Sequence, residues 1–215
     1  MTTIKILQYK LDDNTYKLYD VTFFQTTIST IVTTESSTVD NWIIDTEQHL
    51  DCLSPLVFGL DVEWRPNHIR NRENPIATIQ LCAGNRCLIF QILQSPIIPY
   101  SLLNFLANPN HTFVGVGIDE DAVKLMKHYY LRVGRTVDLR TLAAMVYGVK
   151  ELKSSGLKRL ASIVLGLEIN KPKKVTMSGW DNRWLMPAQV QYACIDAFLS
   201  FEIGRILICS SLFMI

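Results

Sequence analysis

Hydrophobic and polar positions alternate with a period of two near the start of the chain, the pattern typical of half-buried β-strands. Three such runs, rich in β-branched residues, occupy residues 4–10, 16–24 and 26–34. We predict three strands there, followed by a helix at residues 39–50, where apolar side chains are spaced for one helical face.

The middle of the chain holds three more strand-like runs in succession, at residues 56–63, 77–83 and 86–91. Short turns separate the last two, so we predict an antiparallel meander. Further on, strands and helices alternate. The expected strands lie at 112–116 and 133–139, and the expected helices at 101–107, 119–130, 140–147, 156–165 and 187–208. Residues 171–183 are predicted to form a basic loop around a tryptophan.

Strands first and alternating elements later predict an α/β fold, a mixed sheet flanked by helices. We divide the chain into a β-rich N-terminal extension that ends in a helix, residues 1–50, and a main domain, residues 51–215. The length suits one domain with a sizeable core and a small appendage.

Composition narrows the class of protein without naming it. Of 215 residues, 48% are hydrophobic and 19% charged, and the formal net charge is +1, which argues against a strongly basic, duplex-coating protein. The five cysteines are odd in number and form no CxxC pair, so we expect reduced thiols. We see no signal peptide or apolar run of membrane length, so we expect no membrane association and a cytoplasmic or nuclear location.

The first candidate chemistry lies at the end of the strand at residues 56–63. Asp61 and Glu63 are two apart, so their carboxylates share one face of the strand. Carboxylates this close repel each other unless a cation lies between them, and Mg²⁺ prefers such oxygen ligands. A solvated strand end is the simpler alternative for an isolated pair of this kind.

A third acid, Asp121, lies in the first turn of the helix that follows the Gly115-Val-Gly117 turn. Acids favour helix starts through the macrodipole, and we expect Asp119 and Glu120 to have that role. Asp138 also follows a strand, and we expect it to cap the next helix.

The fourth feature is the pair Tyr192 and Asp196, four residues apart on the long C-terminal helix. This spacing places both side chains on one face. A buried aspartate in an apolar helix is costly without a partner, so a functional contact is one explanation. A simple hydrogen bond between the two on a partly exposed face is the other.

Taken in order, these motifs resemble the DEDDy 3′→5′ exonucleases of the ribonuclease H-like superfamily, and most closely Werner-type exonuclease domains. The resemblance runs over residues 57–206 and includes Gly59-Leu-Asp-Val-Glu-Trp64, Gly115-Val-Gly-Ile-Asp-Glu-Asp121 and Tyr192-Ala-Cys-Ile-Asp196. It implies a ribonuclease H-like sheet and two divalent ions, Mg²⁺ or Mn²⁺. The implied metal ligands are Asp61, Glu63, Asp121 and Asp196.

The resemblance also implies how substrate is held and cut, with mononucleotides released from the 3′ end. Glu63 would contact the terminal ribose 3′-OH. An ordinary tyrosine has a pKa of about 10, so we expect Tyr192 to orient the attacking water by hydrogen bonding. The predicted substrate-binding residues are Val62, Trp64, Ile118 and Lys124. Trp64 either stacks on the terminal base or packs in the core.

Basic residues lie in the loops after these motifs and on the helix of Asp121. They either ring the mouth of a site and contact phosphates, or act as scattered solvated charges. The residues concerned are Arg65, Arg70, Arg72, Lys124, Lys171, Lys173, Lys174 and Arg183.

The β-rich N-terminal extension on so small a domain resembles plant exoribonucleases that associate with the RNA-silencing complex and assemble as hexameric rings. That resemblance implies single-stranded RNA 3′ ends as substrate, silencing-complex proteins as partners, and a homo-oligomer. Three alternatives stay open: a Werner-type DNA exonuclease, a non-catalytic nucleic-acid-binding or assembly module, and a phosphatase or nucleotidase.

Overall fold

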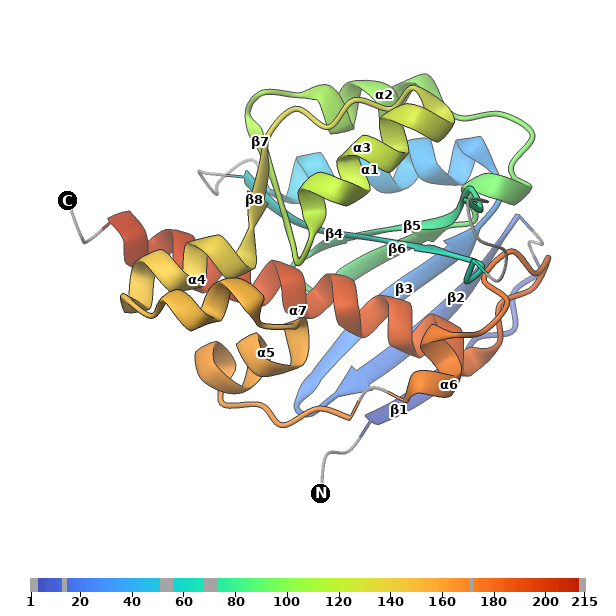
Figure 1. The fold of residues 1–215 in the computed structure, drawn as a ribbon. Coiled ribbons are helices and arrows are strands. Elements are labelled where there is room, and N and C mark those ends of the chain that lie inside the picture. The colour runs from blue at the N-terminus through green and yellow to red at the C-terminus, as the bar shows by residue number, and fades with distance from the viewer. Residues whose placement is uncertain (1–3, 13–14, 51–55, 68–72, 171, 213–215) are drawn as a thin grey trace.

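One continuous sheet organises the molecule, which is described by a computed structural model (Figure 1). The structure describes residues 4–12, 15–50, 56–67, 73–170 and 172–212. Its eight strands run in the order β1-β2-β3-β6-β5-β4-β7-β8. They are β1 (Ile4–Gln8), β2 (Tyr16–Phe23), β3 (Thr26–Thr33), β4 (Leu56–Trp64), β5 (Ile76–Ala83), β6 (Arg86–Phe90), β7 (His111–Gly115) and β8 (Thr136–Asp138).

Helices cover both faces of the sheet. One face carries α1 (Ser36–Leu50), α2 (Tyr100–Ala107) and α3 (Ile118–Tyr129). The other carries α4 (Leu139–Tyr147), α5 (Leu157–Leu165), α6 (Lys173–Thr176) and α7 (Pro187–Leu212). The short 3₁₀ turns η1 (Ile92–Gln94) and η2 (Lys150–Ser154) complete the described elements. None of the described helices is both long and apolar enough to span a bilayer.

Two hydrophobic cores follow from this layering. Strand residues such as Phe58 and Leu60 pack against α1, α2 and α3 on one face. On the other face, Val57 and Cys82 pack against the apolar side chains of α4, α5 and α7. All eight residues of β5 are buried, as expected for a strand in the middle of a sheet covered on both faces.

The predicted meander is confirmed, because β4, β5 and β6 pair antiparallel in sequence order. The N-terminal strands join the same sheet: β1, β2 and β3 pair antiparallel, and β3 pairs with β6 in parallel. The N-terminal extension and the main domain are therefore built on one shared sheet.

Two predictions need correction. Residues 171–183 are not a loop throughout, because Lys173–Thr176 forms the short helix α6. The strand predicted at 133–139 is only three residues long, Thr136–Asp138, since Asp138 already caps the following helix. Lys171 lies outside the described residues.

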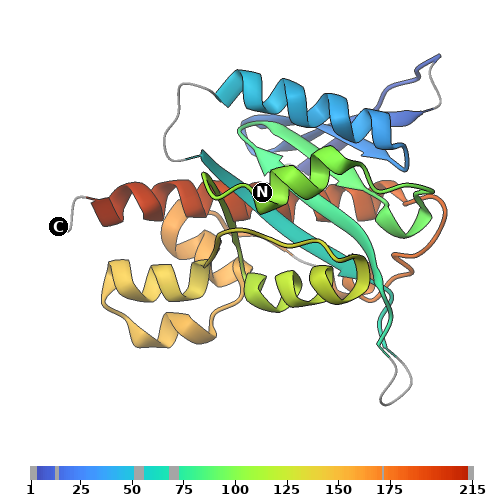
Figure 2. The same ribbon diagram turned by 90° about the horizontal axis from the view of Figure 1, so that it is seen from above.

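Helix α7 lies along one face of the sheet, with α4 and α5 beside it (Figures 1 and 2). At Gly59 of β4 the two backbones come very close. A Cβ atom built on Gly59 would lie 2.0 Å from the carbonyl oxygen of Ala197 and 2.8 Å from the backbone nitrogen of Phe201. Only glycine fits this contact, which brings the middle of α7 to the middle of β4.

We expect Gly59→Ala to destabilise the protein by about 3 kcal/mol, because backbone atoms of α7 must move to admit one methyl group. Urea denaturation followed by circular dichroism would measure the loss. Gly156→Ala is the matched control: nothing lies within 4 Å of its added Cβ, and the expected change is under about 1 kcal/mol. Equal stability of the two variants would contradict the importance of the contact.

Candidate active site

Three predicted acids converge where β4 crosses α7. Asp61 and Glu63 project from the C-terminal part of β4, and Asp196 comes from α7. Each offers a carboxylate oxygen, and these oxygens lie within 4.8 Å of one another. Asp196 is only 4% exposed. The predicted pairing of Asp61 with Glu63 thus holds, and a residue far along the chain completes the cluster.

Asp121, the fourth predicted acid, lines the same cleft from the first turn of α3. The helix follows Gly117, whose φ of 79° lies in the left-handed region that favours glycine. Burial raises the pKa of Asp121 to about 7, and the nearby charge of Lys124 lowers it in part. A carboxyl group so placed is ready to gain or lose a proton near neutral pH.

Asp138 has the structural role that the sequence predicts. Its side chain accepts a hydrogen bond from the backbone N–H of Arg140 at 2.8 Å and so caps α4. It also accepts one from the backbone N–H of Gly117 at 2.9 Å, and the Arg140 guanidinium lies 2.6 Å away. Asp138 therefore fixes the turn that precedes α3, next to the acid cluster.

The cleft itself has a volume of about 360 Å³ and is open to solvent. Strand β4, the start of α3 and the end of α6 supply its walls. Its lining residues are Asp61, Val62, Glu63, Trp64, Pro66, Val116, Gly117, Glu120, Asp121, Thr176 and Met177. The lining combines acidic side chains with apolar ones.

Tyr192 on α7 lines a neighbouring pocket and is linked to this cleft through Thr176. The Thr176 hydroxyl donates a hydrogen bond to the Tyr192 hydroxyl oxygen at 3.3 Å, and Thr176 lines the cleft. The Trp180 indole N–H in turn donates to the Thr176 carbonyl at 3.2 Å, and Trp180 is fully buried. The tyrosine hydroxyl is therefore contacted by the segment that was predicted to be a basic loop around a tryptophan.

The predicted substrate-binding residues differ in exposure. Val62 lines the cleft but is only 3% exposed, and the Ile118 side chain is completely buried in the core. Trp64 lines the cleft and also packs against that core. The Lys124 ammonium lies 3.2 Å from the centroid of the Trp64 ring, a cation–π contact at the rim. A substrate contact by Ile118 stays a prediction.

None of the basic residues that the structure describes is among the side chains that line the cleft. Arg65 makes an ion pair with Asp181 at 2.7 Å, while Arg183 lines a different pocket. Lys173 and Lys174 lie on α6. Arg70, Arg72 and Lys171 lie outside the described residues. Sequence patterns missed Thr176, Met177 and Asp181, which have no motif spacing to mark them.

A mixed sheet with helices on both faces, and acids at the C-terminal end of β4, agrees with the predicted ribonuclease H-like fold. A family model described as 3′-5′ exonuclease matches residues 30–208, so this chain belongs to that family. The matched region starts within β3 and includes α1 and all the candidate site residues.

Two curated relatives are also described as 3′-5′ exonucleases, one of them together with a helicase. A 3′-5′ exonuclease of Arabidopsis thaliana is 34% identical over 151 residues, which are 69% of this chain and 51% of that protein. The bifunctional 3′-5′ exonuclease/ATP-dependent helicase WRN of Mus musculus is 32% identical over 143 residues, 66% of this chain and 10% of that protein. The resemblance to Werner-type domains is confirmed. The chain spans about half or less of these relatives.

Among solved structures, Escherichia coli RNase D, described as an exoribonuclease involved in structured RNA processing, superimposes with a TM-score of 0.69. The alignment covers 84% of this chain and 44% of RNase D at 18% identity. At this identity the likeness establishes the fold.

The titration of Asp121 predicts a pH-dependent effect on stability in metal-free protein. Its pKa is 3.8 in its ordinary state and about 7 in the folded protein. The folded state therefore holds the proton more tightly, and the buried carboxylate costs more stability as pH rises across that interval. We expect Asp121→Asn to stabilise the protein by about 2 kcal/mol more at pH 8 than at pH 5.

Urea denaturation in the presence of a chelator would measure this difference. Asp45→Asn is the control, because its carboxylate is largely exposed on α1 and only pairs with the Arg86 guanidinium at 3.4 Å, so we expect a small effect on stability. If Asp121→Asn behaved like the control, the raised pKa of Asp121 would be refuted.

Proposed function

We propose that this protein is a metal-dependent 3′→5′ exonuclease that removes mononucleotides from single-stranded nucleic acid. One observation carries the proposal: Asp61, Glu63 and Asp196, from a strand and a distant helix, place carboxylate oxygens within 4.8 Å of one another. Membership of the 3′-5′ exonuclease family supports it. A non-catalytic module would not need this costly concentration of like charge.

The chemistry of the donor groups fits divalent ions. All four candidate ligands, Asp61, Glu63, Asp121 and Asp196, are carboxylates, which suit Mg²⁺ or Mn²⁺ rather than softer metals. Three of them are crowded enough to repel each other without a cation. A bound pair of ions would neutralise the scissile phosphate and lower the pKa of the attacking water.

The remaining groups hold and orient the substrate. Glu63, at the end of β4, is assigned to the terminal ribose 3′-OH. Tyr192, held by the hydroxyl of Thr176, is assigned to orienting the attacking water. Trp64 and Lys124 sit together at the rim, where the ring suits the terminal base and the ammonium suits a phosphate. Val62 forms part of the wall behind them.

For the substrate class we propose RNA, with proteins of the RNA-silencing complex as partners and a cytoplasmic or nuclear location. The β-rich N-terminal extension, similar to that of plant exoribonucleases, supports this choice. DNA is the second candidate, favoured by the 32% identity to mouse WRN. Fluorescence microscopy of the tagged protein, and recovery of silencing factors with it, would test location and partners.

The decisive test uses matched 5′-labelled single strands of RNA and DNA. In Mg²⁺ we expect a ladder of products shortened from the 3′ end, faster on RNA, and no products with chelator. Asp61→Ala and Asp196→Ala should lose about 10³-fold or more in kcat, because each removes a metal ligand. Tyr192→Phe should lose about 10²-fold.

Glu151→Gln is the control for these variants. Glu151 is an exposed acid in η2, outside the cleft, and its removal should leave kcat within a factor of about two. Undiminished Mg²⁺-dependent digestion by both alanine variants would refute the proposal. Equal rates on the two labelled strands would refute only the preference for RNA, and release of phosphate from mononucleotides would favour a nucleotidase.

We also propose that the protein forms a homo-oligomer, a hexamer by its resemblance to the ring-forming plant enzymes. Strand β1 offers a sheet edge, and its Leu7 is 58% exposed. An edge strand of this kind can pair with another copy. Light scattering after size-exclusion chromatography should give several times the 24.5 kDa mass of one chain. A monomer at micromolar concentration would contradict the assembly.

A further inference from the structure

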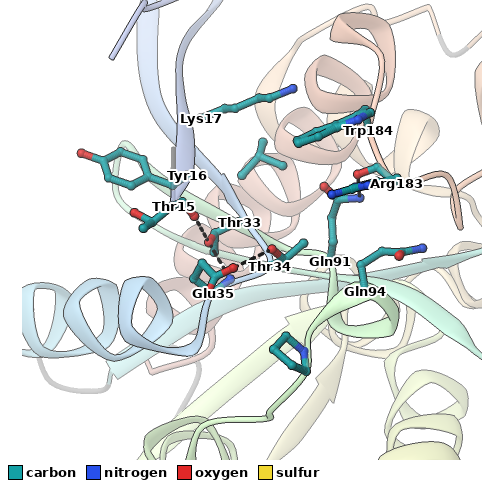
Figure 3. Close-up of a pocket in the computed structure, with 12 residues that line it drawn as sticks. Thr15, Tyr16, Lys17, Thr33, Thr34, Glu35, Gln91, Gln94, Arg183 and Trp184 are labelled. Carbon is teal, nitrogen blue, oxygen red and sulfur yellow. Dashed lines mark hydrogen bonds between the residues drawn. The ribbon is translucent and has the colours of Figure 1, made fainter. Parts of the chain in front are cut away.

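A second pocket, of about 450 Å³, is shown in Figure 3. The strand register places it at the same end of the sheet as the active-site cleft. Strands β3 and β6 both end there, because they run parallel to each other. Strand β2 begins there, because it runs antiparallel to β3. The loop that precedes α7 closes the other side. Lining residues that matter here are Lys17, Glu35, Gln91, Gln94, Arg183 and Trp184.

Two positive charges are held at this pocket by one indole ring. The Lys17 ammonium lies 4.2 Å from the centroid of the Trp184 ring, and the Arg183 guanidinium carbon lies 5.5 Å from it. Trp184 is nevertheless 61% exposed. Such cation–π contacts fix the positions of the two cations. Unlike an ion pair, they do not neutralise the positive charge. The result is a surface suited to a phosphate beside a flat, apolar group.

The pocket is rigidly built, since side-chain amides hold its loop. Gln91 is 4% exposed, and its amide N–H donates to the carbonyls of Asn182 at 3.1 Å and Arg183 at 3.3 Å. The Gln94 amide donates to the Asp181 carbonyl at 2.7 Å. Backbone of β3 is tied in as well, because the Gln91 N–H donates to the Thr33 carbonyl at 2.9 Å.

One acid, Glu35, lies in the pocket away from the two cations. Its carboxylate accepts a hydrogen bond from the Thr34 hydroxyl at 3.3 Å (Figure 3). A uniformly anionic ligand would be repelled there. A nucleotide unit is complementary to the whole arrangement: phosphate near Lys17 and Arg183, an aromatic base near the indole, and ribose hydroxyl or base amino groups toward the carboxylate.

The loop that closes this pocket also borders the active-site cleft. Thr176 and Met177 line the cleft, and Arg183 and Trp184 line the second pocket. Between them, Asp181 is tied to Arg65, the residue after Trp64, by the 2.7 Å ion pair. If the 3′ end of a single-stranded nucleic acid lay in the cleft, the nucleotides upstream of that end would contact this loop.

We propose that the second pocket binds an upstream nucleotide of the same single strand whose 3′ end occupies the active-site cleft. This inference rests on the proposed exonuclease function. The N-terminal strand β2, through Lys17, then takes part in holding substrate. Oligonucleotides too short to cross the loop gain no affinity from the pocket, whereas longer oligonucleotides bind more tightly.

The test measures, by fluorescence anisotropy, the binding of a labelled 12-nucleotide oligouridylate to the full chain. A chelator is present so that the oligonucleotide is not digested. We expect Lys17→Ala and Trp184→Ala to weaken binding three- to tenfold, and Lys17→Arg to restore it. Loss of one phosphate contact should also reduce the slope of log affinity against log salt by about 0.7. Lys158→Ala is the control, because α5 lies at the other end of the sheet (Figure 1).

A second measurement separates the pocket from the active site. In Mg²⁺, Lys17→Ala should raise KM for the 12-nucleotide strand by a similar factor with kcat unchanged, and leave kcat/KM for the dinucleotide UpU within twofold. Wild-type affinity of both Lys17→Ala and Trp184→Ala for the long strand would overturn the inference. Binding that depends on Lys17 in a protein without nuclease activity would instead overturn the exonuclease proposal and leave this pocket standing.

Discussion

The close approach of β4 and α7 is the constraint on which the site depends. Because Gly59 has no side chain, the helix backbone lies against the strand, and Asp196 reaches the carboxylates at the strand end. Crowding of like charges there is unfavourable unless packing enforces it. Packing of the hydrophobic cores on both faces of the sheet holds the carboxylates together. The same packing therefore stabilises the fold and creates the acid cluster of the cleft.

The second organising feature is the segment from α6 to the start of α7. It supplies a wall of the cleft, holds the hydroxyl of Tyr192 through Thr176, and is itself anchored by the buried ring of Trp180. The Arg65–Asp181 ion pair and the amides of Gln91 and Gln94 fix its far end. The position of the Tyr192 hydroxyl and the walls of the cleft and the second pocket therefore depend on one piece of chain.

Much of this could be predicted from the sequence, for a physical reason. The period of two along a strand predicts that Asp61 and Glu63 lie together, as the structure shows. The four-residue spacing on a helix predicts one face for Tyr192 and Asp196. Both relations are local. Their convergence is not local, and only the ordered motifs suggested it. The contact at Gly59 and the Lys17–Trp184 pair join distant segments with no spacing rule, and α6 is too short for a periodic signal.

The parallel pairing of β3 with β6 bears on where the domain begins. The family match starts at residue 30, inside β3, which spans Thr26–Thr33. A shortened chain that started there would lose β1 and β2 and the first half of β3. The remaining half of β3 would still pair with β6, but its backbone amides and carbonyls that pair with β2 would become an unpaired sheet edge. An unpaired edge strand can form backbone hydrogen bonds with another chain. Such a fragment would therefore be prone to self-association for reasons unrelated to any natural assembly.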